Sequence, residues 1–142
     1  MTSTRGFTLP ELVLVLLLAG VAASLAIGPA IHQADALLLR GAREELISFF
    51  RRARGEARAH GEARLLLADG GDPLLVLPDG RPPVRLLLRG RGVELDLLGA
   101  RADLDLHFGP LGTAHFAAAS IRLRKRKAIL SLTVSGYGRV RR

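Results

Sequence analysis

The sequence predicts an α+β fold, in which a long N-terminal helix packs on a C-terminal antiparallel β-sheet. From residue 12 to about residue 59, apolar residues either run without a break or recur every three to four positions, as a helix requires. Beyond Gly61 the period changes to two, which is typical of strands with one buried face. The 142 residues leave room for one small domain and an appendage.

The first helical stretch is apolar on all sides. Residues 12–31 carry no charge, and at a rise of ~1.5 Å per residue they would form about 30 Å of helix. Because this length matches the hydrocarbon core of a bilayer, we predict a membrane-spanning helix here. Two alternatives remain open: a core helix buried on every face, and a secretory signal peptide with its cleavage site behind the apolar stretch.

The second helical stretch, residues 34–59, is amphipathic, and Gly61 is its expected end. Its apolar face is predicted to consist of Leu39, Ala42, Leu46, Phe49 or Phe50, Ala53 and Ala57. Seven strands are predicted after it, separated by turns rich in Gly, Asp and Pro. They are expected near residues 63–68, 74–77, 84–89, 93–98, 103–108, 120–124 and 128–135.

The N-terminal segment Arg5-Gly6-Phe7-Thr8-Leu9-Pro10-Glu11 places Gly-Phe and a single Glu directly before the apolar run. It resembles the class III prepilin leader of type IV pilins and type II secretion pseudopilins. The resemblance implies that a prepilin peptidase cuts between Gly6 and Phe7 and that Phe7 becomes a methylated N-terminus. It also implies that Glu11 pairs with the terminal amine of a neighbouring subunit during assembly. The alternative for Glu11 is a carboxylate that only reaches water at a membrane surface.

This resemblance implies a pilin-like fold, with a membrane half and an amphipathic half of the helix ahead of the sheet. Residues 1–6 would be the cleaved leader, 7–31 the transmembrane and filament-core helix, and 32–142 a globular domain. The positive-inside tendency of Arg5 would keep the N-terminus cytoplasmic. The expected location is therefore the bacterial inner membrane, crossed once, with the C-terminal domain periplasmic. The expected partners are inner-membrane lipid and other pilins or pseudopilins in a filament.

Two further motifs resemble the GspH/FimT group of minor pilins and pseudopilins. Phe108-Gly109-Pro110-Leu111-Gly112 matches a turn that precedes the last hairpin of that group. The chain then ends in a Gly-Arg-x-Arg signature, Gly138-Arg139-Val140-Arg141. In FimT-like minor pilins this tail is associated with binding DNA during uptake, so the resemblance implies a DNA contact at Arg139 and Arg141.

The charge distribution favours the same end of the chain. The net charge is +8, and residues 1–121 contain equal numbers of acidic and basic side chains, so the whole excess lies in the last 21 residues. A basic end on a neutral body suggests a polyanionic partner, here DNA bound non-specifically through its phosphates. The nominated second contact consists of Arg122, Arg124, Lys125, Arg126 and Lys127. The alternatives are a solvated turn that protects a sheet edge, and a tail that docks on another pilin.

We found no catalytic motif in the sequence and predict no enzymatic activity, no cofactor and no metal site. The absence of cysteine excludes disulfides, thiolate metal sites and a cysteine nucleophile. Four acidic residues could be considered as a metal cluster. We expect them instead to form the solvated face of two adjacent strands, opposite Arg122 and Arg124. These residues are Glu94, Asp96, Asp103 and Asp105.

The predicted function is a minor pilin or pseudopilin of the type IV pilus or type II secretion machinery, with a basic tail that binds DNA for uptake. The alternative is a GspH-type pseudopilin of type II protein secretion without a DNA-binding role. A membrane-anchored enzyme or adaptor is disfavoured because the sequence lacks catalytic motifs and carries the leader.

Overall fold

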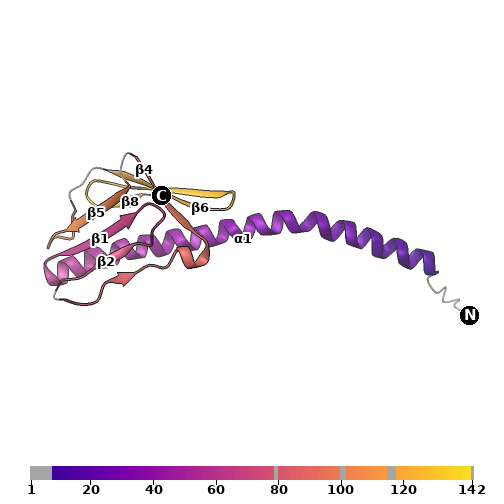
Figure 1. The fold of residues 1–142 in the computed structure, drawn as a ribbon, viewed down its shortest axis with the longest axis horizontal. Coiled ribbons are helices and arrows are strands. Elements are labelled where there is room, and N and C mark those ends of the chain that lie inside the picture. Colours follow the sequence, from indigo (N-terminus) through magenta and orange to yellow (C-terminus); the bar gives the residue numbers. More distant parts are fainter. Residues whose placement is uncertain (1–7, 79, 100–101, 115–117, 142) are drawn as a thin grey trace, which may run out of the picture. The chain divides into compact units, whose positions relative to one another are not determined.

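The computed structural model describes residues 8–78, 80–99, 102–114 and 118–141, without the side chains of residues 25–30. By internal contacts the chain forms two compact units, Met1–Ala34 and Asp35–Arg142. Helix α1 runs from Leu9 to His60 and so contributes to both (Figure 1). Each unit is described separately.

Hydrogen bonds between Thr8 and Glu11 cap the start of α1. The backbone N–H and the hydroxyl of Thr8 both donate to Glu11 Oε2 at 3.0 Å, and the first intrahelical bond runs from the Leu12 N–H to the Thr8 carbonyl. The helix ends at His60 because Gly61 takes the left-handed conformation, with φ of 91°. The predicted end at Gly61 is therefore confirmed.

The first unit contains the predicted membrane helix, and that prediction is wrong for the described residues. None of the helical segments they form combines the length and the apolar character needed to cross a membrane. The transmembrane assignment of residues 7–31 and the inner-membrane location are corrected accordingly.

The second unit has its core against the amphipathic part of α1. The predicted apolar face of the helix is confirmed, and both phenylalanines belong to it. The buried helical residues are Leu39, Ala42, Leu46, Ile47, Phe49, Phe50, Ala53 and Ala57. All of these except Ile47 pack with inward-facing side chains of the strands in one continuous core.

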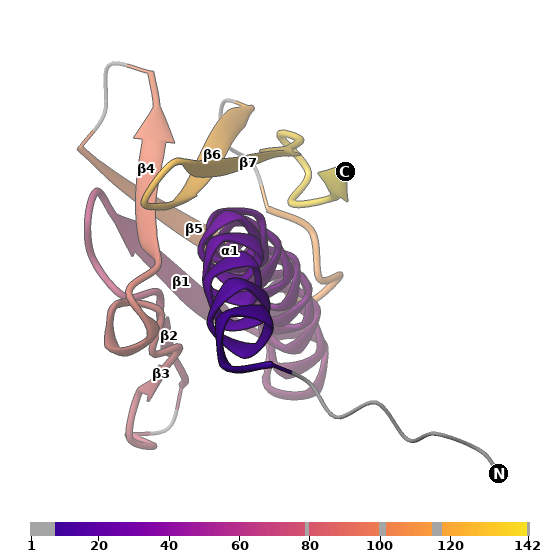
Figure 2. The same ribbon diagram turned by 90° about the vertical axis from the view of Figure 1, so that its right-hand side faces the viewer.

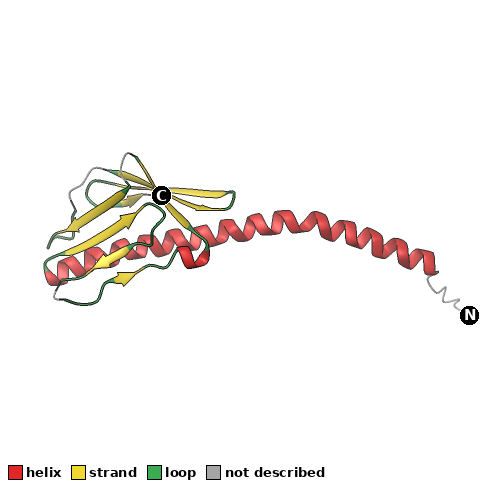
Figure 3. Ribbon diagram, in the orientation of Figure 1, coloured by secondary structure: helices red, strands yellow, loops and turns green. Residues whose placement is uncertain are grey.

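Eight strands follow in the described part of the chain, most of them at the predicted positions. They are β1 (Ala63–Ala68), β2 (Leu74–Val76), β3 (Val84–Arg85), β4 (Glu94–Leu98), β5 (Asp103–Phe108), β6 (Ala119–Lys125), β7 (Ala128–Val134) and β8 (Val140–Arg141). The third strand is much shorter than predicted, a 3₁₀ turn (Arg89–Arg91) follows it, and the last strand was not predicted. Figure 3 shows the strands in yellow beside the part of the red helix that belongs to this unit.

The strands form two antiparallel sheets, so the predicted fold, a pilin-like helix on one sheet, is wrong. One sheet has the order β3-β2-β1-β5 and the other β4-β6-β7-β8. Figure 2 shows strands of both sheets beside the helix of this unit. Alternation of apolar residues fixes the buried face of a strand but not its partner. Strands β4 and β5 are consecutive in the chain, but they belong to different sheets, and the alternation did not reveal this.

The turn after β1 links the two sheets. Asp69 Oδ1 accepts the Leu97 N–H at 2.9 Å, and the Gly70 N–H donates to the Leu95 carbonyl at 2.7 Å. A second aspartate, Asp72, accepts the N–H groups of Leu88 and Arg89 at 2.9 Å and so fixes the segment that leads into β4. These Asp and Gly residues are turn formers in the sequence, but here their hydrogen bonds also determine the division into two sheets.

Candidate nucleic-acid interface

The C-terminal Gly-Arg-x-Arg tail is held in a tight hairpin. The Ser135 N–H donates to the Arg139 carbonyl at 2.8 Å, and the Arg139 N–H donates back to Ser135 Oγ at 3.1 Å. Strand β8 then pairs with β7, with Arg141 opposite Thr133. Backbone pairing thus fixes the positions from which Arg139 and Arg141 extend into solvent.

Gly138 connects this tail to the other GspH/FimT-like motif. Its φ is 75°, and a Cβ built on it would approach Phe108 Cε1 to 2.7 Å. Phe108 is itself 1% exposed. Position 138 therefore requires glycine for two reasons: the backbone is in the left-handed conformation, and the Phe108 ring leaves no space for a side chain. The two motifs, 30 residues apart in the sequence, meet in the fold.

The turn that follows Phe108 lies against the last part of α1. Arg54 Nε donates to the Gly112 carbonyl at 3.1 Å, and Arg58 Nε donates to the Leu111 carbonyl at 3.3 Å. Gly112 has a φ of 68°, and a Cβ there would lie 2.7 Å from Arg58 Nε. The turn therefore holds two helix arginines beside the tail.

A groove of about 640 Å³ lies between these elements. Four arginines line it, and hydroxyl groups supply most of its other polar lining. The lining residues are Arg54, Arg58, Thr113, Ala118, Thr133, Ser135, Tyr137, Arg139 and Arg141. We call it the arginine groove, after its four arginines Arg54, Arg58, Arg139 and Arg141.

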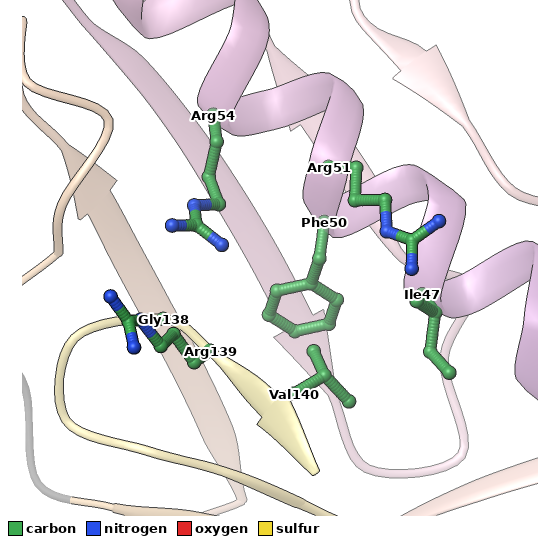
Figure 4. Close-up of a pocket in the computed structure, with 7 residues that line it drawn as sticks. All are labelled: Ile47, Phe50, Arg51, Arg54, Gly138, Arg139 and Val140. Carbon is green, nitrogen blue, oxygen red and sulfur yellow. The ribbon is translucent and has the colours of Figure 1, made fainter. Parts of the chain in front are cut away.

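A smaller hollow of about 250 Å³ also involves Arg54 and Arg139. Figure 4 shows that both extend their guanidinium groups to the same side of the gap between α1 and the tail. Arg51 points to the other side, and Phe50 and Val140 lie between (Figure 4). The helix and the tail thus present positive charge toward a common space.

The arginine groove is not neutralised by the described part of the chain. None of its four arginines forms an ion pair with a described carboxylate, and none of the described lining residues is acidic. Guanidinium groups that share a groove repel one another, more strongly where water is partly excluded. An anion with several oxygens would relieve this repulsion and accept the free N–H groups.

The second predicted contact has a different electrostatic setting. Arg124 Nη2 donates to Glu94 Oε2 at 2.5 Å and Arg124 Nε lies 3.9 Å from Asp96 Oδ2. The hydrogen bond to Glu94, followed by the charges of Glu94 and Asp96, raises the pKa of Arg124 above its ordinary value. Arg122 lies opposite Asp96 in the register of β4 and β6. The acids of β4 therefore face the arginines of β6, as predicted.

The remaining cations of this contact lie at the β6–β7 turn. Lys125 Nζ donates to the Arg91 carbonyl at 2.6 Å, and Arg126 Nη1 lies 3.5 Å from Asp35 Oδ2. Arg126 has a left-handed backbone, with φ of 52°, and Lys127 is exposed beside it. None of the residues 122–127 lines the arginine groove, so the structure does not bring the two predicted contacts together.

The acidic residues considered for a metal site are divided between the sheets. Glu94 and Asp96 are on β4, and Asp103 and Asp105 are on β5, so the expectation of two adjacent strands was wrong. Asp105 forms an ion pair with Arg64. Over the described ranges, no group of three or more potential metal ligands lies together.

Of the predicted processing and assembly residues, Gly6 and Phe7 lie outside the described residues. Glu11 lies in the first turn of α1, where it is exposed. Hydrogen bonds from the backbone N–H and then the hydroxyl of Thr8 lower the pKa of Glu11. Within the single chain Glu11 is thus a helix-capping carboxylate.

Sequence reasoning did not nominate Arg54 and Arg58 as functional residues. Their spacing of four places them on one side of the helix, next to the buried stripe that includes Ala53 and Ala57. That spacing was the available signal, but nothing local indicated that the tail would lie beside it.

No family model, no curated protein and no solved structure matches the chain. The functional assignment therefore depends on the motifs and on the geometry described above.

Proposed function

We propose that this protein is a non-enzymatic filament subunit of the minor pilin or pseudopilin kind, processed at Gly6/Phe7, whose C-terminal tail binds DNA. The observation that carries the DNA-binding part is the arginine groove around the tail, which lacks an acidic partner among the described residues. Phosphate oxygens match guanidinium N–H donors in charge and geometry. The two GspH/FimT-like motifs support the same site because they contact each other at Gly138 and Phe108.

The filament part of the proposal is supported by the leader and by the first unit. The helical part of the first unit exposes a continuous set of apolar side chains. Among them, Leu12 is 56% exposed, Leu14 is 57% exposed and Leu16 is 64% exposed. Such a surface normally marks an association site, because burial of apolar area stabilises a complex. Neighbouring copies or related subunits would cover it in a filament.

Binding is expected to be electrostatic and tolerant of sequence. Each arginine that neutralises a phosphate releases counterions, so the affinity falls as salt rises. Tyr137 is the only aromatic residue among the described residues of the arginine groove, so recognition of bases by stacking is not expected.

The proposal is tested by measuring the affinity of the full-length chain for a labelled oligonucleotide over a series of salt concentrations. Arg139→Gln with Arg141→Gln should lower the affinity about tenfold or more and reduce the slope of log K against log salt by about 2. The control is Arg40→Gln with Arg89→Gln, which removes the same charge at exposed positions outside the groove. Equal affinity of the two double variants would contradict a DNA-binding tail and leave a filament subunit without this role.

A further inference from the structure

We propose that Arg54 and Arg58 of α1 form the second wall of the DNA-binding site, so that the phosphate backbone is held between the helix and the tail. The inference rests on the proposed function and deepens it, because it adds contacts that the tail motif does not contain. Four features of the described residues support it.

The first feature is position. Arg54 and Arg58 line the same groove as Arg139 and Arg141, and Arg54 also shares the smaller hollow with Arg139. In Figure 4 the guanidinium groups of Arg54 and Arg139 extend to the same side. A backbone bound by the tail at this point would therefore pass within reach of the helix.

The second feature is orientation. Each helix arginine uses its Nε–H for a backbone carbonyl of the 108–112 turn, as described above. An arginine has five N–H donors in a planar fork, so the Nη groups of both side chains stay available for a ligand. Because the turn already holds the forks in place, less side-chain entropy is lost when phosphate binds.

The third feature is the glycine that permits this arrangement. At Gly112 a Cβ would lie 2.7 Å from Arg58 Nε and 3.2 Å from the Arg54 carbonyl. Only glycine allows the turn to approach both arginines with a φ of 68°. The Phe-Gly-Pro-Leu-Gly turn is thus a positioning element for the helix wall.

The fourth feature is the chemistry between the walls. Thr113, Thr133 and Ser135 add hydroxyl donors to the groove. Hydroxyl and guanidinium groups together are the usual contacts of protein side chains with nucleic-acid phosphates. The combination favours a phosphodiester chain, which offers several oxygens in succession, over a single small anion.

The test compares three double variants of the full-length chain by the same salt-dependent titration, on single-stranded and duplex oligonucleotides. Arg54→Gln with Arg58→Gln should weaken binding about tenfold and reduce the salt slope by about 2, as the tail variant does. The charge-matched control, Arg40→Gln with Arg89→Gln, should keep most of the affinity. If the helix variant matches this control while the tail variant is impaired, the second wall is wrong and the proposed function stands. If both match the control, the proposed function fails as well.

A second variant separates a lost contact from a disturbed fold. Arg54→Lys with Arg58→Lys keeps both charges but removes the planar fork and the Nε–H bonds to the turn. It should keep the salt slope of the parent and lose less affinity than the Gln variant. If the Lys variant binds as weakly as the Gln variant, with the same reduced slope, the arginines act only by supporting the turn, and the inference is overturned.

Discussion

The β6–β7 hairpin and the arginine groove are both rich in cations, but they differ in what faces those cations. In the hairpin, Arg124 faces Glu94 and Asp96 on β4, and Arg126 faces Asp35 on α1. In the groove, no described acid is within ion-pairing distance of the arginines. The comparison teaches that a count of positive residues along the sequence does not identify an anion site. Whether acidic residues of other elements form ion pairs with these cations determines which of them remain available to bind a ligand.

The largest expected effect comes from Phe108, on which the tail rests. Phe108→Ala should lower the free energy of unfolding by about 3–5 kcal/mol, because it removes a fully buried ring and leaves a cavity. It should also weaken DNA binding, because the tail loses its contact at Gly138. Chemical denaturation and the salt titration measure the two effects.

Phe49→Ala is the matched control for Phe108→Ala, since Phe49 is buried in the core but lines neither hollow beside the tail. It should destabilise the protein comparably and leave the affinity of the folded protein unchanged. Equal losses of affinity in both variants would mean that general stability, rather than the placement of the tail, controls binding.

Gly138→Ala sharpens the comparison because it changes no charge. The new methyl group would collide with the Phe108 ring and require a strained φ, which should cost about 1–3 kcal/mol. The affinity for DNA should fall as the tail moves, which the salt titration detects. Gly70→Ala has a similar φ of 63° with no atom within 4 Å, so it tests the backbone strain alone and should leave the affinity unchanged.

Arg126→Gln tests the opposite region. It removes the partner of Asp35, which is only 4% exposed, and should lower the free energy of unfolding by about 1 kcal/mol, since the arginine itself is largely in water. Adding Asp35→Asn should restore part of that loss in thermal unfolding. DNA affinity should fall no more than in Arg89→Gln; a larger loss would place the hairpin in the binding site.

The elements of the fold were predictable where the signal is local. The buried stripe of α1 and the boundaries of β1 and β5 follow from periodicity, because each depends on which face of one element is apolar. The division into two sheets was not predictable. It depends on hydrogen bonds from the 69–72 turn to segments more than 15 residues away, such as Asp69 with Leu97.

The site was predictable to a smaller extent. Motif and charge nominated Arg139 and Arg141, and the structure places both in one groove. The same reasoning nominated residues 122–127, because it counted cations without knowing that β4 and Asp35 would face them. Arg54 and Arg58 were missed for the converse reason, since a helix arginine looks solvated until the turn at residues 111–112 is placed against it.

Glu11 extends the comparison to an acid whose partner is the backbone, and it should give the smallest effect. Hydrogen bonds from Thr8 lower the pKa of Glu11 in the folded chain. The contribution of Glu11 to the stability of the folded state is therefore complete above the ordinary pKa of a glutamate. This contribution is lost as the pH falls through the lowered pKa, because protonation neutralises the carboxylate that accepts the hydrogen bonds from Thr8, and the start of α1 then frays. An NMR titration should show the Thr8 amide resonance shifting at a pH below the ordinary pKa of a glutamate, and Glu11→Gln should abolish this shift. A Thr8 amide that shifts at the ordinary pKa of a glutamate would mean that the hydrogen bonds between Thr8 and Glu11 do not persist in solution, leaving Glu11 as an ordinary surface carboxylate before assembly.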